Sequence, residues 1–301
     1  MSRESQAATL TLESGVVEEV RFIGSFSRQM LTFVHNPVRA ATRGVVICSP
    51  IMAELQVNQR RERELANRLA EQGMAVLRFH SVGEGNSDAL DGGITLDTLV
   101  DDAAEATTWF TQATNVETLG FVGTRLGGVP AAATAAKLGA PVALWAPITN
   151  IDRYFSELSR IRSVARLIAG EASEGARSSM SEMLRQEGDV DVVGYSITKA
   201  FVESCHTTTI AGALRGIPVP VLLVALGAPP TVYDGLRDEL TDAGSAVDVV
   251  VVEGNPSWWL QTVDEREMGD VNDKLLISST VEWMADVLTP SDPVSRKHPS
   301  R

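Results

Sequence analysis

Short apolar runs alternate with amphipathic segments along most of the chain. An apolar run bounded by turn residues is typical of a strand buried on both faces, whereas apolar positions three and four residues apart indicate a helix. The runs predict strands at residues 16–23, 29–35, 44–48, 75–79, 117–123, 141–146, 219–226 and 247–253. Apolar positions three and four residues apart predict helices at residues 57–71, 96–110, 126–138, 231–243 and 271–287.

The order of these elements predicts the fold class. Nearly continuous apolar strands that alternate with helices form mostly parallel sheets with helices on both faces. Only the first two strands are expected to form a hairpin, through residues 24–27. Residues 60–68 are expected to lie largely on the solvent side of the first helix. The predicted fold class is therefore α/β, with a mostly parallel sheet and flanking helices.

One long segment interrupts the alternation. Residues 149–217 show helical periodicity without a clear strand. Helices are predicted there at residues 154–169, 178–186 and 198–204. The chain is thus divided into a core of residues 1–148 and 218–288, a helical lid of residues 149–217 and a tail of residues 289–301.

Composition and charge restrict the partners and the compartment. The 301 residues carry a net charge of −13, and Lys and Arg cluster only at residues 60–63, so neither nucleic acid nor membrane is an expected partner. No apolar run reaches the ~18 residues of a membrane helix, and residues 1–14 lack the pattern of a secretory signal. Two cysteines without a spacing pattern fit a reducing compartment, so a cytoplasmic protein is predicted. The Pro/Ser-rich, charged tail is predicted to be disordered, and no role is expected for His298.

The clearest functional signal is a turn between a strand and a helix. Residues 119–128 read as an apolar strand, a Gly-x-Xaa-x-Gly turn and the start of a helix. Gly123 and Gly127 suit a turn at which strand and helix nearly touch, and in α/β-hydrolases this turn holds the nucleophilic serine. Here Arg125 holds that position, and a guanidinium that stays protonated cannot act as a nucleophile.

The other two positions of a Ser-His-Asp triad also lack their usual residues. The histidine of such a triad follows the last strand, near Asn255, but the four histidines are at positions 35, 80, 206 and 298. The acid position falls at Gly227 or Ala228, neither of which is acidic. The sequence therefore predicts that another chemistry, or none, runs on this scaffold.

Residues that directly follow the strands are the candidates for a site, because ligands of open α/β sheets bind beyond the carboxyl ends of the strands. Arg125 is interpreted either as an anchor for a carboxylate or phosphate or as half of an ion pair with Glu54. Glu54, expected in a loop, is a candidate partner of Arg125 or general base, with a solvated carboxylate as the alternative. His80 is a candidate general base or a hydrogen-bonded structural residue. Further candidates for substrate binding are Ser49, Ile51, Thr124, Leu126, Asn255, Trp258 and Trp259.

Thiol chemistry is a less favoured alternative. Cys205 and His206 are adjacent in the predicted lid, and a reactive thiolate needs a basic neighbour. Neighbouring residues on a helix point in different directions, however, which disfavours such a pair. No cofactor is expected, since the chain has neither a glycine-rich dinucleotide fingerprint nor metal-ligand spacing.

Several stretches resemble the α/β-hydrolase superfamily and, within it, the exosortase A system-associated hydrolases. The stretches are residues 49–55 with Arg60 or Arg61, residues 79–87 with His80 where an Asp is common, residues 144–147 followed by Tyr154 and Arg160, residues 194–198, and the Gly-x-Arg-x-Gly turn at residues 123–127. The resemblance implies an α/β-hydrolase fold with a helical lid and a small-molecule pocket. It does not bring a triad with it, because the serine and histidine are absent from the matching positions.

Three functions remain open on the sequence. The first is an enzyme that acts on an acyl, ester, thioester or carboxylate-bearing small molecule through an Arg-centred pocket, with backbone amides of Ile51 and Leu126 as an oxyanion hole. The second is a non-catalytic pseudo-hydrolase that binds a small molecule or serves as an accessory protein in a biosynthetic pathway. The third is a purely structural partner. The expected ligand is anionic or carbonyl-bearing, and a homodimer is one of the oligomeric states left open.

Overall fold

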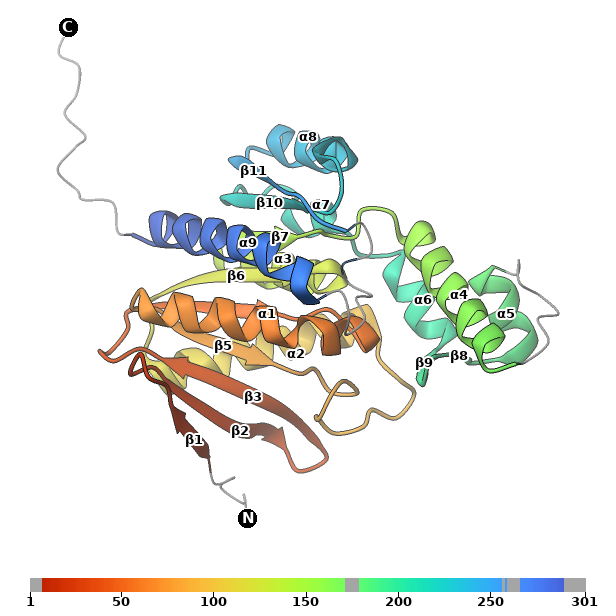
Figure 1. Cartoon of the computed structure of the whole chain (residues 1–301), viewed down its shortest axis with the longest axis horizontal. Helices are drawn as coiled ribbons and strands as arrows, with labels where there is room; N and C mark the ends of the chain where they lie inside the picture. The colour runs from red at the N-terminus through yellow and green to blue at the C-terminus, as the bar shows by residue number, and fades with distance from the viewer. Residues whose placement is uncertain (1–6, 171–178, 256–257, 259–265, 290–301) are drawn as a thin grey trace, which may run out of the picture.

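A nine-stranded sheet forms the centre of the protein, in the order β1-β2-β3-β5-β4-β6-β7-β10-β11 (Figure 1). The computed structural model describes residues 7–170, 179–255, 258 and 266–289. The strands are β1 (Ala8–Thr11), β2 (Val17–Ser25), β3 (Arg28–Asn36), β4 (Arg43–Cys48), β5 (Ala75–Phe79), β6 (Thr118–Thr124), β7 (Val142–Trp145), β10 (Val221–Leu226) and β11 (Val247–Val252). The β1–β2, β2–β3 and β3–β5 pairs are antiparallel, and the remaining neighbours are parallel.

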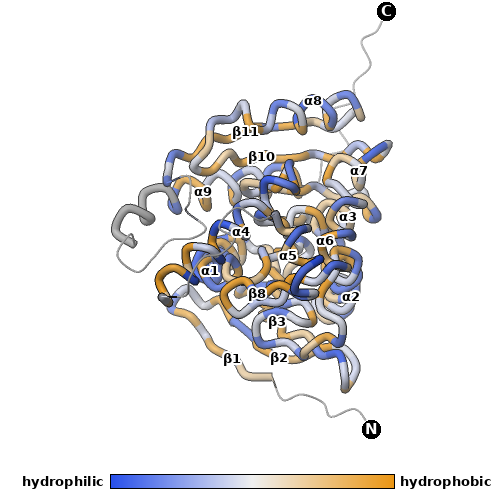
Figure 2. Tube along the Cα trace, turned by 90° about the vertical axis from the view of Figure 1, so that its right-hand side faces the viewer, coloured by the Kyte–Doolittle hydropathy of each residue, from blue (hydrophilic) through white to orange (hydrophobic). Residues whose placement is uncertain are grey.

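Helices cover both faces of this sheet. They are α1 (Met52–Glu71), α2 (Leu96–Thr114), α3 (Gly128–Leu138), α8 (Asp234–Asp242) and α9 (Arg266–Val287), with short 3-10 turns η1 (Arg125–Gly127) and η2 (Pro230–Tyr233). α1 and α9 pack side by side on one face, and α2 and α3 on the other (Figure 1). Each face has its own apolar core, and every residue of β5, β7 and β10 is buried. These strands are apolar except for Arg78 in β5, and β10 is drawn largely in the colour of hydrophobic residues in Figure 2. The predicted mostly parallel α/β architecture is confirmed.

The segment of residues 149–217 folds beside the carboxyl ends of the strands, and we call it the insertion. It contains α4 (Ile151–Ile168), α5 (Met180–Glu187), β8 (Val190–Val192), β9 (Tyr195–Ile197), α6 (Lys199–Cys205) and α7 (Ile210–Leu214), while residues 171–178 lie outside the described part (Figure 1). α7 packs on α3 and α6 on α2. The Leu96 amide donates a hydrogen bond to Ser204 Oγ at 2.8 Å, which ties the insertion to the start of α2.

Four details differ from the sequence prediction. β1 was not predicted, because all four of its residues are exposed and it carries no buried pattern. The insertion contains the β8–β9 hairpin, whose turn residues Val193 and Gly194 both have positive φ, although no strand was expected there. α7 was not predicted either, since its five residues are too few to show a period.

The fourth difference concerns α1. It begins at Met52, five residues before the predicted start at residue 57, so Glu54 lies in its first turn and not in a loop. Arg61 and Glu62 are buried, contrary to the expectation that residues 60–68 lie largely on the solvent side. Both differences matter for the site, because they place charged side chains of α1 inside the protein.

No helix in the described part of the chain combines the length and the apolar character needed to cross a bilayer. The predicted disordered tail begins at residue 289, and residues 290–301 lie outside the described part.

Candidate functional site

The turn after β6 brings strand and helix into close contact. β6 ends at Thr124, and α3 follows directly after η1. A Cβ at Gly123 would lie 2.6 Å from Gly128 Cα, and one at Gly127 would lie 2.4 Å from the carbonyl oxygen of Cys48, so both positions require glycine. Arg125 itself has φ of 52°, a left-handed conformation that is strained for a non-glycine residue and typical of functional turns.

The Arg125 guanidinium is held by two carboxylates. Nε donates to Glu54 Oε2 at 3.2 Å and Nη2 donates to Glu54 Oε1 at 3.3 Å. Nη2 also donates to Glu157 Oε2 at 3.3 Å, from α4 of the insertion. The guanidinium carbon lies 5.8 Å from the ring centroid of Tyr154. Of the two interpretations of Arg125, the structure contains the ion pair with Glu54.

Burial governs the charges of this cluster. Arg125 is 9 % exposed and Glu54 3 %. Burial raises the pKa of Glu54, and the guanidinium of Arg125 offsets part of that rise. Burial by itself lowers the pKa of Arg125, but the charge of Glu54 outweighs it, so the pKa is raised and Arg125 stays charged. By its two contacts with the guanidinium, Glu54 is the counter-ion of a buried cation.

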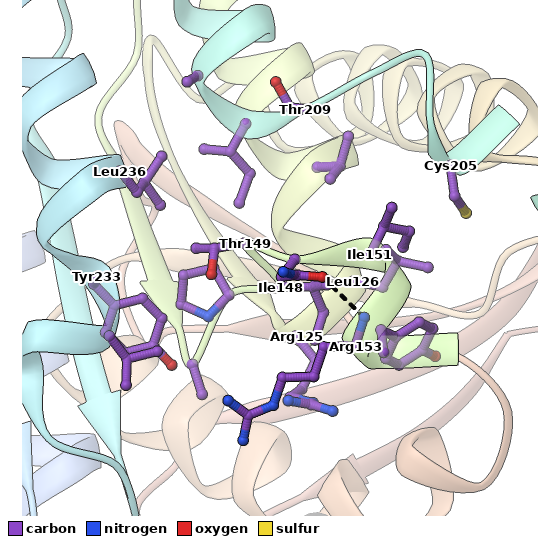
Figure 3. Close-up of a pocket in the computed structure, with 18 of the residues that line it drawn as sticks. Arg125, Leu126, Ile148, Thr149, Ile151, Arg153, Cys205, Thr209, Tyr233 and Leu236 are labelled. Atoms are coloured by element: carbon purple, nitrogen blue, oxygen red, sulfur yellow. Dashed lines mark hydrogen bonds between the residues drawn. The ribbon is translucent and has the colours of Figure 1, made fainter. Parts of the chain in front are cut away.

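A cavity of about 740 Å³ lies between this turn, the insertion and the β10–α8 region (Figure 3). Arg125, Leu126 and Glu157 line it at the turn. Apolar side chains line much of the remainder, from elements that are distant in sequence: Val129, Ile148, Ile151, Ile210, Tyr233 and Leu236. Its size lies within the range of about 300–1,000 Å³ that is usual for small-molecule sites.

His80 lies at a different, much smaller cavity. That cavity has a volume of about 20 Å³ and is lined also by Ser49, Ile51 and Glu84. The Asn86 amide donates to His80 Nδ1 at 3.2 Å. Burial, and then the charge of Arg78, lowers the pKa of His80 to about 4, so its ring is neutral. The structure thus gives His80 the hydrogen bond of its structural alternative and does not bring it to the larger cavity.

Ser49 and Thr124 meet a buried acid that the sequence analysis did not single out. Ser49 Oγ donates to Glu62 Oε2 at 2.6 Å. Burial raises the pKa of Glu62 to about 7, although the hydrogen bond from Ser49 and the charge of Arg78 offset part of the rise. Neither Ser49 nor Thr124 lines the larger cavity. The expected solvent exposure of α1 at this position concealed Glu62.

The remaining candidates are divided between the cavity and its surroundings. Trp258 is buried, lines the larger cavity and stacks with Arg61, whose guanidinium carbon is 5.4 Å from the ring centroid. The Asn255 carbonyl accepts a hydrogen bond from the Trp258 amide at 3.0 Å. Trp259 lies outside the described residues.

Cys205 and His206 both line the larger cavity. Burial raises the pKa of Cys205 to about 12, so the thiol keeps its proton at neutral pH. His206 Nε2 lies 3.8 Å from Asp152 Oδ1 at the surface. The two side chains therefore do not form an activated thiolate.

Two residues of this cavity, Tyr154 and Glu157, lie in the insertion; the sequence had named Tyr154 only as part of the family resemblance and had not singled out Glu157. Tyr154 and Glu157 are three positions apart on α4, so they lie on one face of the helix, and both line the cavity. Their spacing could have indicated that they share a helix face, but nothing in the sequence indicated that this face lies next to Arg125. Within the described ranges, no group of three or more His, Cys, Asp or Glu residues is arranged to hold a metal ion.

Comparison with known proteins identifies the fold. No protein-family profile matches the sequence, and no curated protein matches it. Est1E from Butyrivibrio proteoclasticus, solved with ferulic acid, superposes with a TM-score of 0.63 at 14 % identity over 89 % of this chain and 99 % of that one. A dienelactone hydrolase from Anabaena variabilis gives 0.54 at 14 % identity over 95 % and 100 %, and a proline iminopeptidase from Mycobacterium smegmatis gives 0.54 at 16 % over 88 % and 98 %.

Proposed function

On the basis of this α/β-hydrolase fold, we propose that the protein binds a small molecule in the cavity beside Arg125 and does not hydrolyse it through a covalent intermediate. One observation carries the proposal. The side chain at the turn after β6 is a guanidinium held by Glu54 and Glu157, at the position where acyl transfer on this fold uses a nucleophile. In this proposal the insertion closes over the cavity as a lid. We also propose that the protein is related to the exosortase A system-associated hydrolases.

The other groups that acid–base or thiol chemistry would use are engaged elsewhere. Glu54 neutralises Arg125 and does not line the cavity. His80 is neutral and accepts a hydrogen bond from the Asn86 backbone amide at another cavity. Cys205 holds its proton. A site built this way supports recognition better than turnover, because catalysis needs groups that are free to change their protonation or bonding.

The lining of the cavity supports an apolar ligand that carries a polar end. Aliphatic side chains and Tyr233 form a large part of the lining, and its charged side chains include Arg125 at the turn, Arg153 and Glu157 on α4, and Glu239 on α8. Cavities of this kind hold a ligand by its apolar body and orient it through a few polar groups. Within the same fold, the Butyrivibrio protein binds ferulic acid, which is an aromatic carboxylic acid.

A second candidate is an enzyme that acts on an ester, thioester or other acyl compound without a covalent intermediate. It is favoured by Leu126, which follows Arg125 at the N-terminal end of the α3 region and lines the cavity. Backbone amides at such a turn can stabilise the oxyanion of a reacting carbonyl.

One experiment separates the two candidates. Purified wild type, Arg125→Ala and the surface control Arg237→Ala are assayed with short-chain esters and thioesters and, in parallel, screened by calorimetry against neutral, anionic and cationic small molecules. The proposal predicts saturable binding in wild type and in the control, with no turnover above the buffer rate. Steady turnover that disappears in Arg125→Ala would establish the enzyme instead, and the absence of both binding and turnover would refute both.

A further inference from the structure

The two carboxylates on Arg125 are not equivalent. Glu54 makes two contacts with the guanidinium and has a side chain that is 4 % exposed. Glu157 makes one contact at 3.3 Å, has a side chain that is 20 % exposed and lines the cavity. A bidentate, buried pair is held more firmly than a single contact that solvent reaches. Glu54 is therefore the fixed partner and Glu157 the exchangeable one.

Glu157 also has a second cation on its own helix. Arg153 Nε lies 3.3 Å from Glu157 Oε1, one turn earlier on α4, and the Arg153 side chain is 73 % exposed. If Glu157 leaves Arg125, it keeps this partner and gains water. Glu157 that has left Arg125 is thus still paired and partly solvated. The exchange therefore does not bury an unpaired carboxylate, and its cost is low.

A polar group next to this contact lacks a partner. Tyr154 lines the cavity one turn before Glu157, and its hydroxyl is buried with no hydrogen-bond partner among the described residues. Burial raises the pKa of Tyr154, so the phenol keeps its proton and can donate. A buried hydroxyl without a partner is destabilising, and a hydrogen bond to a ligand oxygen would remove that cost.

We infer that Glu157 is an internal stand-in for a ligand carboxylate, and that the molecule bound in this cavity is an apolar carboxylic acid that displaces Glu157 from Arg125. This inference rests on the proposed binding function. The ligand carboxylate accepts from Arg125 Nη2 and from the Tyr154 hydroxyl, and its apolar body lies against Ile151 and Leu236. Arg125 keeps two carboxylates before and after the exchange, so the charge of the buried cluster is unchanged.

The exchange also links binding to the insertion. The contact between Glu157 and Arg125 joins α4 to the turn after β6. A carboxylate that takes its place removes this tie, so binding loosens α4 relative to the sheet. Neutral molecules of the same shape leave the tie intact.

The test uses 3-phenylpropanoate and its neutral amide as matched probes, with dissociation constants measured by calorimetry at pH 7.5. The proteins are wild type, Glu157→Gln and the control Glu182→Gln, which removes an exposed glutamate of α5 paired with Arg185. Glu157→Gln is expected to bind the carboxylate about fivefold more tightly, which corresponds to about 1 kcal/mol for a partly exposed ion pair, and to bind the amide as wild type does. Amide exchange of α4 is expected to be faster in Glu157→Gln than in the control.

Each other outcome overturns the inference. Equal effects of Glu157→Gln on both probes would mean that the carboxylate does not compete with Glu157. Absence of carboxylate binding in Glu157→Gln would mean that this class is not the ligand. In either case the proposed binding function stands if the wider screen finds a neutral or cationic ligand, and it fails only if that screen is empty as well.

Discussion

Arg125 shows how a single charged residue dictates what must surround it. The turn after β6 buries its side chain, and a buried guanidinium without an acceptor is costly. Glu54, in the first turn of α1, supplies the acceptor, although it lies 71 positions from Arg125 in the chain. The turn therefore needs this ion pair to keep Arg125 buried, whether or not the site has a catalytic role.

Removal of Arg125 tests that dependence. Arg125→Met leaves Glu54 buried without a counter-ion, so the free energy of unfolding is expected to fall by about 3 kcal/mol in urea titrations at pH 7.5. Addition of Glu54→Gln is expected to recover part of the loss, since the unpaired charge is then gone. The control Arg153→Met removes an exposed cation and should cost less than about 1 kcal/mol. Strict additivity of the two buried substitutions would show that the pair is not coupled.

A second buried acid makes stability depend on pH. Glu84 accepts the Met52 amide at 2.8 Å, and burial raises its pKa from 4.5 to about 7. The folded protein therefore holds this proton more firmly than the unfolded chain does. The resulting contribution to stability is fully present below about pH 4.5 and is lost as the pH rises through about 7.

Glu84→Gln should remove this dependence while it keeps an oxygen for the Met52 amide. Relative to wild type, the variant is expected to gain about 2 kcal/mol in the free energy of unfolding between pH 5 and pH 8. Urea titrations of both proteins at each pH give the difference, in which the shared contributions of His35 and His80 cancel. A difference that stays constant with pH would contradict the raised pKa.

At the scale of single elements, the start of α1 explains an error of the sequence analysis. No side chain caps the helix from within its own segment, and Ile51 is the N-cap residue. The carboxylate of Glu84 accepts the first helical amide from a loop 32 positions away. A capping residue that is distant in sequence leaves no signal next to the helix, which is why the helix was predicted to begin later.

The turn after β6 is the element that the sequence identified best, and its glycines can be tested directly. Gly127→Ala would place a Cβ 2.4 Å from the carbonyl oxygens of Cys48 and Ser49. Backbone atoms cannot move aside cheaply, so a loss of about 3 kcal/mol is expected. Gly235→Ala in α8 is the matched control, because a Cβ there meets nothing within 4 Å. It should gain about 0.5–1 kcal/mol through the lower entropy of the unfolded chain. Thermal unfolding of both variants measures the contrast, and equal midpoints would contradict the close contact.

For the whole molecule, the insertion and the sheet share one apolar core. Phe155, Phe201 and Ile210 of the insertion belong to the same cluster of buried side chains as Phe110 of α2 and Leu144 of β7. The hydrogen bond from the Leu96 amide to Ser204 adds a polar tie. A division into separately folding units is not expected from such packing.

Calorimetry tests this expectation. The free protein should unfold in one transition whose calorimetric and van't Hoff enthalpies agree. A saturating ligand should move that single transition upward, because it binds only the folded state. A separate transition at lower temperature, lost in a variant that lacks residues 149–217, would instead show that the insertion melts alone.

The sequence by itself determined the layers and the turn. β4 and β5 lie where continuous apolar runs predicted them, and the glycines at 123 and 127 marked the turn, because burial on both faces and close backbone contact each restrict residue type locally. The position of Arg125 between these two glycines was also visible, since it depends on one residue within a local motif.

Only the tertiary structure decided which charges meet. Glu54 and Glu157 reach Arg125 from different helices, Glu84 caps α1 from a distant loop, and Glu62 is buried against Ser49. A carboxylate looks the same in sequence whether it is solvated or buried. Its partner, its pKa and its availability to a ligand are set by the long-range packing that removes water from around it.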